Sequence, residues 1–314
     1  MPPGWASKWT NFTAARLWHK VNKVARQRGT PLAGLVVTSP HYLDLVKRVG
    51  SLVPCFYYCS DDYTQYTAWG GDALLKQEAE LVRTVRHSFF VSRTLADRAV
   101  KVHGVPEDCV SVSPNATEEK FLMPVSEEQI DSLFHQFPAL KRPLVGVVGG
   151  INDRLDFDLI ARCAALPEVG SVVLVGGVDA AAGGDGMESL QADPRCIFVG
   201  QRPHDELPVW MQALDVALIP YRDTPLNRSC SPMRLFDHLA SGRRIVATQD
   251  CAQVTEMSSW VDVGHDADDI CRLLIGQIRS GTGQPNHTQQ QMATDHLWSS
   301  RAKHILRCMT APLS

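Results

Sequence analysis

Two side chains that can act together on a ligand, Arg234 and Asp237, stand three residues apart in a segment that favours a helix followed by a strand. Ser231 suits the N-cap, Pro232 the first helical position and Gly242 the left-handed residue that ends the helix. The start of a helix offers unpaired N–H groups and partial positive charge, so it can hold a phosphate, with Arg234 adding a full charge. The carboxylate of Asp237, about one turn further along the helix, could accept hydrogen bonds from ribose hydroxyls. The segment therefore predicts a nucleotide diphosphate site, although a solvated surface helix would carry the same residues.

A second set of candidates follows the buried strand expected at residues 144–148. Gly149 and Gly150 form a turn that lets the phosphates of a ligand approach backbone amides, and the segment continues to Arg154 before the next helix. No G-x-G-x-x-G fingerprint is present, so an ordinary tight strand-to-helix turn remains the alternative. The polar loop 222–228 precedes the helix at Arg234 and is expected to form one wall of the site.

Asp61 and Asp62 follow another expected strand, at residues 55–59. Ligands of parallel α/β sheets bind at the carboxyl ends of the strands, which makes both residues candidates for acid–base work. Either carboxylate can instead cap the segment that follows.

The elements that must position these residues alternate between short apolar strands and amphipathic helices, which predicts α/β domains with parallel sheets. A polar, proline-punctuated stretch at 118–142 marks the expected boundary between a domain at 1–140 and a domain at 141–314. The strands are expected at 35–38, 55–59, 87–91, 110–113, 144–148, 171–175, 197–200, 216–220 and 245–248, and the longer helices at 42–49, 72–86, 92–100, 156–166, 206–214, 231–242, 267–279 and 289–309.

Composition narrows the class of protein. A net charge of −3 argues against a general nucleic-acid binder. Nine scattered cysteines fit a reducing compartment better than a disulfide framework or a zinc site, so no metal is expected. No run approaches the length of a membrane span, and the first thirty residues lack the apolar core of a signal peptide. These features predict a cytoplasmic protein.

The first thirty residues carry basic side chains and no acid, the first acid being Asp44. Trp5, Trp9 and Trp18 are interleaved with them. This composition is typical of an interfacial helix on an anionic membrane, which predicts peripheral association at the inner face of the plasma membrane. The alternative is a helix whose apolar stripe packs on its own domain while its basic face meets water. The basic residues are Lys8, Arg16, Lys20, Lys23, Arg26 and Arg28.

Several segments resemble, in order and spacing, the donor domain of GT-B glycosyltransferases. The similarity is to bacterial enzymes related to glycosyltransferase families four and one, which build surface polysaccharides. It implies two Rossmann-like domains facing across a cleft, with the acceptor on the first, a nucleotide sugar on the second, and a final helix that crosses back. The matching segments are 149–159, 198–203, 215–220 and 231–248, together with 57–62, 90–92 and 113–115 in the first domain.

The resemblance also implies roles for individual residues. Asp237 matches the carboxylate that holds the ribose hydroxyls, and Arg234 and Arg154 match cations that meet the diphosphate beside Gly149, Gly150 and Ser231. The loop Gly200, Gln201 and Arg202 matches the one beside the base. Asp61 or Asp62 would line the acceptor side, as a base in an inverting mechanism or as a sugar contact in a retaining one. Because cations and helix-end amides stabilise the leaving diphosphate, no metal is obligatory.

The implied activity is transfer of a sugar from a UDP- or GDP-sugar to a glycan or lipid-linked acceptor, with the nucleotide sugar as co-substrate and no cofactor. Three features depart from the family pattern. Ser229 stands where a first carboxylate is usual, Asp237 is a methylene shorter than the usual Glu, and a basic helix stands where a strand and glycine-rich loop should open the first domain, as if that domain were truncated. The alternatives are a degenerate, non-catalytic binding or scaffold subunit and a nucleotide-sugar epimerase.

Overall fold

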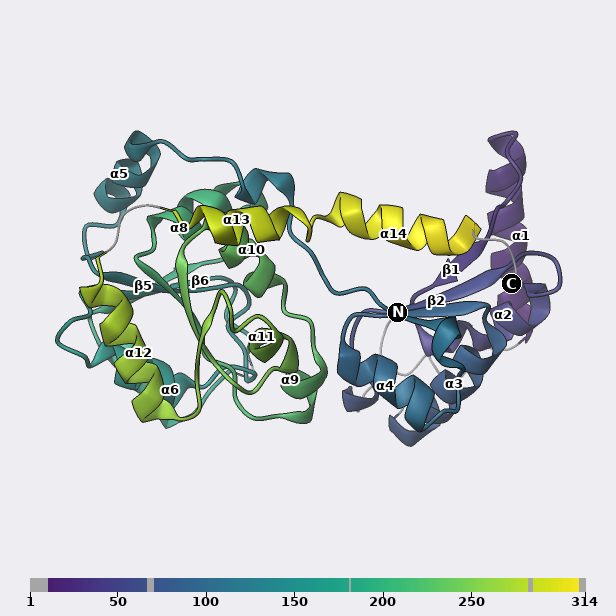
Figure 1. Ribbon diagram of the computed structural model, residues 1–314, viewed down its shortest axis with the longest axis horizontal. Helices are drawn as coiled ribbons and strands as arrows, with labels where there is room; N and C mark the ends of the chain where they lie inside the picture. Colours follow the sequence, from purple (N-terminus) through teal and green to yellow (C-terminus); the bar gives the residue numbers. More distant parts are fainter. Residues whose placement is uncertain (1–10, 67–70, 181, 282–284, 311–314) are drawn as a thin grey trace. The chain divides into compact units, whose positions relative to one another are not determined.

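The computed structural model describes residues 11–66, 71–180, 182–281 and 285–310, which form two compact units (Figure 1). The first unit takes in residues up to Pro114, together with Ser229–Ser231 and the segment from Arg301 onward; the second takes in Asn115–Arg228 and Pro232–Ser300. The sequence predicted the boundary within the stretch 118–142, but the division falls just before that stretch, between Pro114 and Asn115. That stretch contains a helix, α5 (Glu127–Gln136), which packs on α8 (Leu207–Ala213) of the second unit.

The first unit is built on a parallel four-stranded sheet in the order β1-β2-β3-β4. Its strands are β1 (Leu35–Val37), β2 (Cys55–Cys59), β3 (His87–Phe90) and β4 (Val110–Val112). They are short and mainly apolar, and the central strands β2 and β3 are mostly buried whereas β1 and β4 at the edges are only partly buried.

Helices α1 (Asn11–Gln27), α2 (Leu43–Val49), α3 (Gly71–Thr84) and α4 (Arg93–Lys101) belong to the first unit. The α4 helix begins where the sequence predicted, because the hydroxyl of Ser92 accepts a hydrogen bond from the Leu95 amide at 3.4 Å.

The α1 helix packs on α2 through one face. Ala14 is fully buried there, and Leu17 and Trp18 pack against the core of the first unit. The basic residues of α1 are exposed on its other face. The described part of α1 therefore fits the packed-helix alternative for its apolar stripe, while Trp5 and Trp9 lie outside the described residues.

The second unit holds a parallel six-stranded sheet in the order β10-β9-β8-β5-β6-β7. Every residue of β5 is buried, in keeping with its place inside the sheet. Strand order reverses between β5 and β8, the point at which doubly wound sheets open a crevice for ligands at their carboxyl ends. The strands are β5 (Leu144–Val148), β6 (Ser171–Val175), β7 (Cys196–Gly200), β8 (Val216–Ile219), β9 (Arg244–Thr248) and β10 (Asp262–Gly264).

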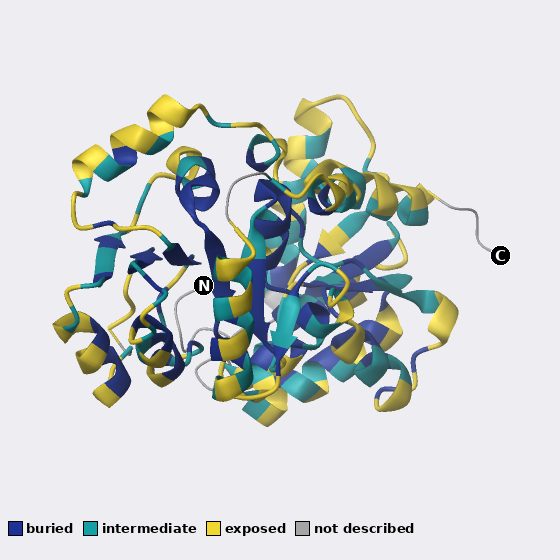
Figure 2. Cartoon of the chain, turned by 60° about the vertical axis from the view of Figure 1, so that its left-hand side comes forward, coloured by how far each residue is buried: buried dark blue, intermediate teal, exposed yellow. Residues whose placement is uncertain are grey.

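Two groups of helices flank this sheet, as Figure 1 shows. One group consists of α6 (Phe157–Ala164), α7 (Asp185–Ala192) and α12 (Ala267–Arg279), in which α6 contacts both α7 and α12. The other consists of α5, α8, α10 (Met233–Ser241) and α13 (His287–Thr294), in which α10 contacts α8 and α13. Two short helices, α9 (Pro225–Ser229) and α11 (Ala252–Glu256), lie in the loops. Figure 2 shows the helices buried on one side and exposed on the other, which is the amphipathic pattern that the sequence predicted.

The start of α10 differs from the prediction. Pro232, with φ −76° and ψ 120°, is the extended residue before the helix, so Ser231 is not its N-cap and Met233 is the first helical residue. The predicted end is confirmed, because Gly242 adopts the left-handed conformation with φ 70°.

The single C-terminal helix predicted at 289–309 is two helices, α13 and α14 (Trp298–Thr310). The break follows from pairing with Thr117, whose amide donates to the His296 carbonyl at 2.9 Å and whose carbonyl accepts from the Trp298 amide at 3.1 Å. From Arg301 onward α14 belongs to the first unit, where Arg301 Nε donates to the Pro114 carbonyl at 3.0 Å.

Candidate functional site

The candidate site lies at the switch point of the second sheet, beyond the carboxyl ends of β5 and β8. Gly149 follows β5 and has φ 118°, a conformation that a side chain would strain. A Cβ at this position would come within 2.9 Å of Arg234 Nη2. The glycine therefore lets a guanidinium lie directly on the backbone of the β5 turn.

Arg234, in the first turn of α10, is held by this turn and by an aromatic ring. Its Nη2 donates to the Gly150 carbonyl at 2.9 Å, and its guanidinium lies 5.4 Å from the centre of the Tyr221 ring. Its Nη1 is buried and has no hydrogen-bond partner among the described residues. A buried, unsatisfied charged donor is costly, so an anionic ligand at this point would be favoured.

Arg154 supplies a second cation at the same ring, with its guanidinium 5.4 Å from the centre of Tyr221. Its Nε donates to Asn227 Oδ1 at 2.8 Å. Asn227 is fully buried, and its Nδ2 donates to the carbonyls of Arg154 at 3.0 Å and Arg222 at 2.8 Å. The amide thus fixes the Arg154 side chain and its backbone together.

Asp237 lies one turn further along α10. Its Oδ1 accepts a hydrogen bond from the Thr117 hydroxyl at 2.7 Å. Burial raises the pKa of Asp237 from 3.8 to about 6, although the Thr117 hydrogen bond acts to lower it. The carboxylate is therefore mostly ionised at neutral pH and can accept hydrogen bonds from ligand hydroxyls.

A polar cluster joins the segment after Thr117 to the start of α8. His204 Nε2 lies 2.9 Å from Glu118 Oε1, and Lys120 Nζ lies 2.7 Å from Asp205 Oδ1. The hydrogen bond with His204 lowers the pKa of Glu118. The charges of His204, Glu118 and Lys120 also act on Asp237, so this exposed cluster tunes the carboxylate electrostatically.

The loop predicted beside the base, Gly200, Gln201 and Arg202, begins at the last residue of the edge strand β7. Gly200 is left-handed with φ 72°, and Gln201 is exposed. The Arg202 guanidinium lies 5.2 Å from the Phe137 ring and 6.0 Å from the Trp210 ring, between α5 and α8. The Arg202 side chain is thus committed to packing, and the backbone and Gln201 remain the parts of this loop that suit a base.

Among the other predicted residues, Ser231 groups with the first unit. In the second unit, Arg234 contacts the Gly149–Gly150 turn and shares the Tyr221 ring with Arg154, and Asp237 lies one helical turn from Arg234. Three of their partners were not singled out from the sequence. Thr117 and Tyr221 carried no pattern that marked them, whereas Asn227 belongs to the polar loop that was expected to form a wall of the site.

The two acceptor-side candidates, Asp61 and Asp62, lie in the first unit and have different surroundings. Asp62 is only 4% exposed, pairs with Arg98 at 2.9 Å, and caps the turn Tyr63–Gln65 by accepting the Thr64 amide at 3.2 Å. Asp61 is partly exposed, and its Oδ2 accepts a hydrogen bond from the Tyr66 hydroxyl at 2.6 Å. The cap and ion pair give Asp62 a structural task, which leaves Asp61 as the candidate for contact with substrate.

His238, on α10, is fully buried, and neither ring nitrogen has a hydrogen-bond partner among the described residues. Burial, and then the charge of Arg234, lower the pKa of His238 to about 3. The ring is therefore neutral and packs as an apolar group.

No family model matches the chain. It is 28% identical over 170 residues to the "Putative teichuronic acid biosynthesis glycosyltransferase TuaH" of Bacillus subtilis, a match that covers 52% of this chain and 42% of that protein. The match thus spans less than half the length of this curated relative.

The solved structures show the fold. Anabaena HepE in complex with UDP aligns with a TM-score of 0.72 at 14% identity, over 93% of this chain and 81% of that one. Its complex with UDP-glucose aligns at 0.67 and 15% identity, over 88% and 78%. Sucrose-phosphate synthase from Thermosynechococcus elongatus aligns at 0.69 and 18% identity, over 96% and 78%. The predicted α/β fold of GT-B glycosyltransferases is thereby confirmed.

Proposed function

We propose that the chain transfers a glycosyl unit from a UDP- or GDP-sugar to a glycan or lipid-linked acceptor in the synthesis of a polysaccharide. The observation that carries this proposal is the pairing of Arg154 and Arg234 over Tyr221 at the switch point, with Asp237 one turn away. A diphosphate suits the two cations, and ribose hydroxyls suit the carboxylate. The similarity to a relative named as a teichuronic acid biosynthesis glycosyltransferase and to a fold solved with UDP-glucose supports the same function.

In this reaction Arg154 and Arg234 stabilise the leaving group, the nucleoside diphosphate. When the bond between the anomeric carbon and the diphosphate oxygen breaks, the diphosphate gains one negative charge. Arg154 and Arg234 lie where that charge would develop, and the buried Nη1 of Arg234 is a donor ready for it. Since side chains supply the positive charge, the step needs no metal.

On the acceptor side, we propose that Asp61 contacts the incoming hydroxyl. As a base it would take the hydroxyl proton as the oxygen attacks the anomeric carbon, and in a retaining reaction it would hold a sugar hydroxyl. Its Oδ2 accepts the Tyr66 hydroxyl and its Oδ1 accepts the Asp62 amide at 2.9 Å, so the carboxylate is held in a defined orientation.

The donor site is tested by thermal-shift titration with UDP, GDP and ADP. A ligand at about a hundred times its dissociation constant stabilises by roughly 2.7 kcal/mol. Arg234→Gln and Arg154→Gln are expected to abolish the shift, and Arg272→Gln, an exposed residue of α12, is the matched control. Absence of a shift with every nucleotide would remove the donor site.

Product analysis with and without acceptor distinguishes glycosyl transfer from the two alternatives, an epimerase and a non-catalytic subunit. Release of UDP or GDP that depends on an added acceptor supports transfer, and conversion of the nucleotide sugar without acceptor would mark an epimerase. Nucleotide binding with neither reaction would mark a non-catalytic subunit, the alternative that Ser229 motivates.

We also propose that the N-terminal segment attracts the chain to an anionic membrane from the cytoplasmic side. Because Leu17 and Trp18 pack on the core, the described part of α1 offers charge rather than apolar area. Each exposed cation contributes about 1 kcal/mol near an anionic surface, an attraction that salt weakens. No described helix is both long and apolar enough to span a bilayer.

Co-sedimentation with vesicles tests this attraction. Binding is expected to anionic but not to neutral vesicles, and it should disappear when the four exposed cations of residues 20–28 are replaced by Gln. Unchanged binding after the replacement would refute the membrane role and leave the donor site untouched.

A further inference from the structure

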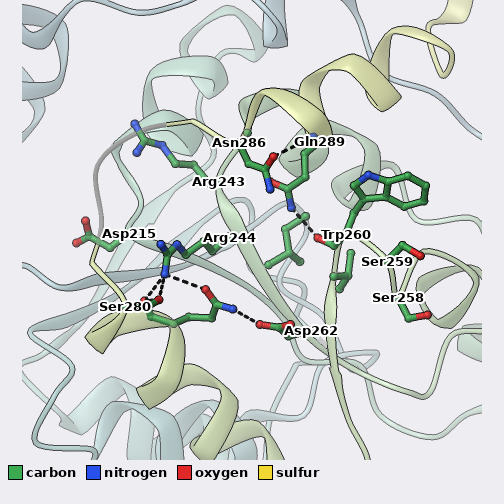
Figure 3. Close-up of a pocket in the computed structure, with 14 residues that line it drawn as sticks. Asp215, Arg243, Arg244, Ser258, Ser259, Trp260, Asp262, Ser280, Asn286 and Gln289 are labelled. Atoms are coloured by element: carbon green, nitrogen blue, oxygen red, sulfur yellow. Dashed lines mark hydrogen bonds between the residues drawn. The ribbon is translucent and has the colours of Figure 1, made fainter.

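A separate cavity of about 380 Å³ lies at the amino-terminal edge of the second sheet (Figure 3). It is lined by the first residues of β9 and β10, the end of α12 and the start of α13. The candidate nucleotide site lies at the other edge, because Thr248, at the end of β9, donates its hydroxyl to the Tyr221 carbonyl at 2.8 Å. The strand between Arg244 and Thr248 separates the two by about 13 Å. The cavity is thus distinct from the nucleotide site and large enough for a small ligand.

Gln289, which lines this cavity, has a buried acceptor without a donor in the described part of the chain. Gln289 is 3% exposed, and its Nε2 donates to the Trp260 carbonyl at 2.6 Å. Its Oε1 is buried and receives no hydrogen bond from the described residues. A buried carbonyl left in this state costs about 1–3 kcal/mol, which a ligand hydroxyl would offset. Asn286 and several serines add further polar groups around it.

Arg243 and Arg244 line the cavity together with the carboxylates of Asp215 and Asp262. Both carboxylates are engaged: Asp215 pairs with Arg142 and accepts a hydrogen bond from the Leu144 amide at 2.5 Å, and Asp262 accepts one from Gln277 Nε2. With Arg142 included, three arginines face two carboxylates here. Burial, followed by the nearby charge of Arg142, lowers the pKa of Arg243. A cation under these conditions is stabilised by an added anion.

We propose that this cavity is a second ligand site, which binds an anionic sugar unit with its phosphate or carboxylate at Arg243 and Arg244 and its hydroxyls at Gln289 and Asn286. The ligand bridges β9, β10 and the start of α13, so its binding stabilises the second unit without occupying the nucleotide site.

Glucose 6-phosphate, glucuronate and inorganic phosphate serve as probes in a thermal-shift titration of the full chain at low salt, with glucose as the neutral comparison. The two anionic sugars are expected to stabilise the protein more than glucose or phosphate alone, and the tighter of them identifies the anionic group. Equal shifts with glucose, or no shift with either anionic sugar, would overturn the proposal.

A matched pair of substitutions tests the location. Ser259 is exposed and lines the cavity, so Ser259→Asp adds a charge with little risk to folding, and Ser259→Asn has the same shape without it. Asp is expected to weaken binding of the anionic sugar about fivefold relative to Asn. Equal affinities would place the ligand elsewhere.

Two further measurements separate this site from the nucleotide site. Arg234→Gln is expected to abolish the nucleotide shift and preserve that of the anionic sugar, and loss of both would mean that the sugar binds at the nucleotide site. Hydrogen exchange on the wild-type chain should show sugar-dependent protection of residues 242–245 and 258–262. Protection confined to other segments would contradict the assignment.

Discussion

Replacement of Asp237 by Asn is expected to change how the stability of the protein depends on pH. Burial raises the pKa of Asp237 from 3.8 to about 6 in the folded chain. A raised folded-state pKa means that the protonated form is favoured by folding. Its contribution to stability is fully present below pH 3.8 and is lost as the pH rises through 6.

The size of the effect follows from the shift. A difference of about two pKa units corresponds to about 3 kcal/mol between the two protonation states. Between pH 4.5 and pH 7.5 the ionisation of this residue lowers the free energy of unfolding of the wild type by about 2 kcal/mol. Asn cannot ionise and can still accept the Thr117 hydroxyl. The free energy of unfolding of Asp237→Asn, taken relative to wild type, is therefore expected to be about 2 kcal/mol higher at pH 7.5 than at pH 4.5.

The assay is urea unfolding of both proteins at pH 4.5 and pH 7.5. Asp131→Asn, at an exposed position of α5, is the control and should show no such change. Binding of uridine or guanosine, which carry no phosphate to titrate, should strengthen as the pH rises through 6 and be lost in Asp237→Asn. A stability difference that does not vary with pH would refute the assigned environment of this carboxylate.

Three further outcomes follow from the same contacts. Asp62→Asn is expected to lower the free energy of unfolding by about 3 kcal/mol in urea curves, because Arg98 loses one of its buried carboxylates. Asp61→Asn should lower turnover while reducing the free energy of unfolding by less than about 1 kcal/mol. Gly149→Ala introduces strain of about 1–3 kcal/mol and pushes on Arg234, so calorimetry should show weaker UDP binding. EDTA should leave acceptor-dependent UDP release unchanged, and a loss restored by Mg²⁺ would contradict a transfer step that relies on side-chain cations alone.

Most strands of the two sheets could be predicted closely because each is a short, mainly apolar run between turn residues. Strand β10 was not predicted, because the three residues Asp262–Gly264 are too few and too polar to stand out. Helix α5 was missed because its stretch reads as a polar linker, although Ser126 and Gln129 form a capping box that the sequence displays. The break before Trp298 has no glycine or proline to announce it. It depends on pairing with Thr117, far away in the chain, which local pattern cannot show.

The residues of the candidate site could be predicted in part, but the contacts that fix them could not. The carboxyl ends of parallel strands share an edge, so Gly149 and Arg234 could be expected together from the order of the elements. The contacts that fix them could not, since the position of Tyr221 over both guanidiniums depends on how β8 leaves the sheet. The sequence likewise could not say which of Asp61 and Asp62 is buried in an ion pair.

The arrangement at Tyr221 explains how such a site would favour reaction over mere binding. Asn227 and the Gly150 carbonyl hold the two guanidiniums in place before any ligand arrives, so little ordering is needed when one binds. The diphosphate of a nucleotide sugar carries one negative charge fewer than the diphosphate that leaves. Two fixed cations therefore interact more strongly with the departing group than with the substrate, and an interaction that grows along the reaction lowers the barrier. Losing either cation should then reduce turnover more than it weakens binding of the intact nucleotide sugar.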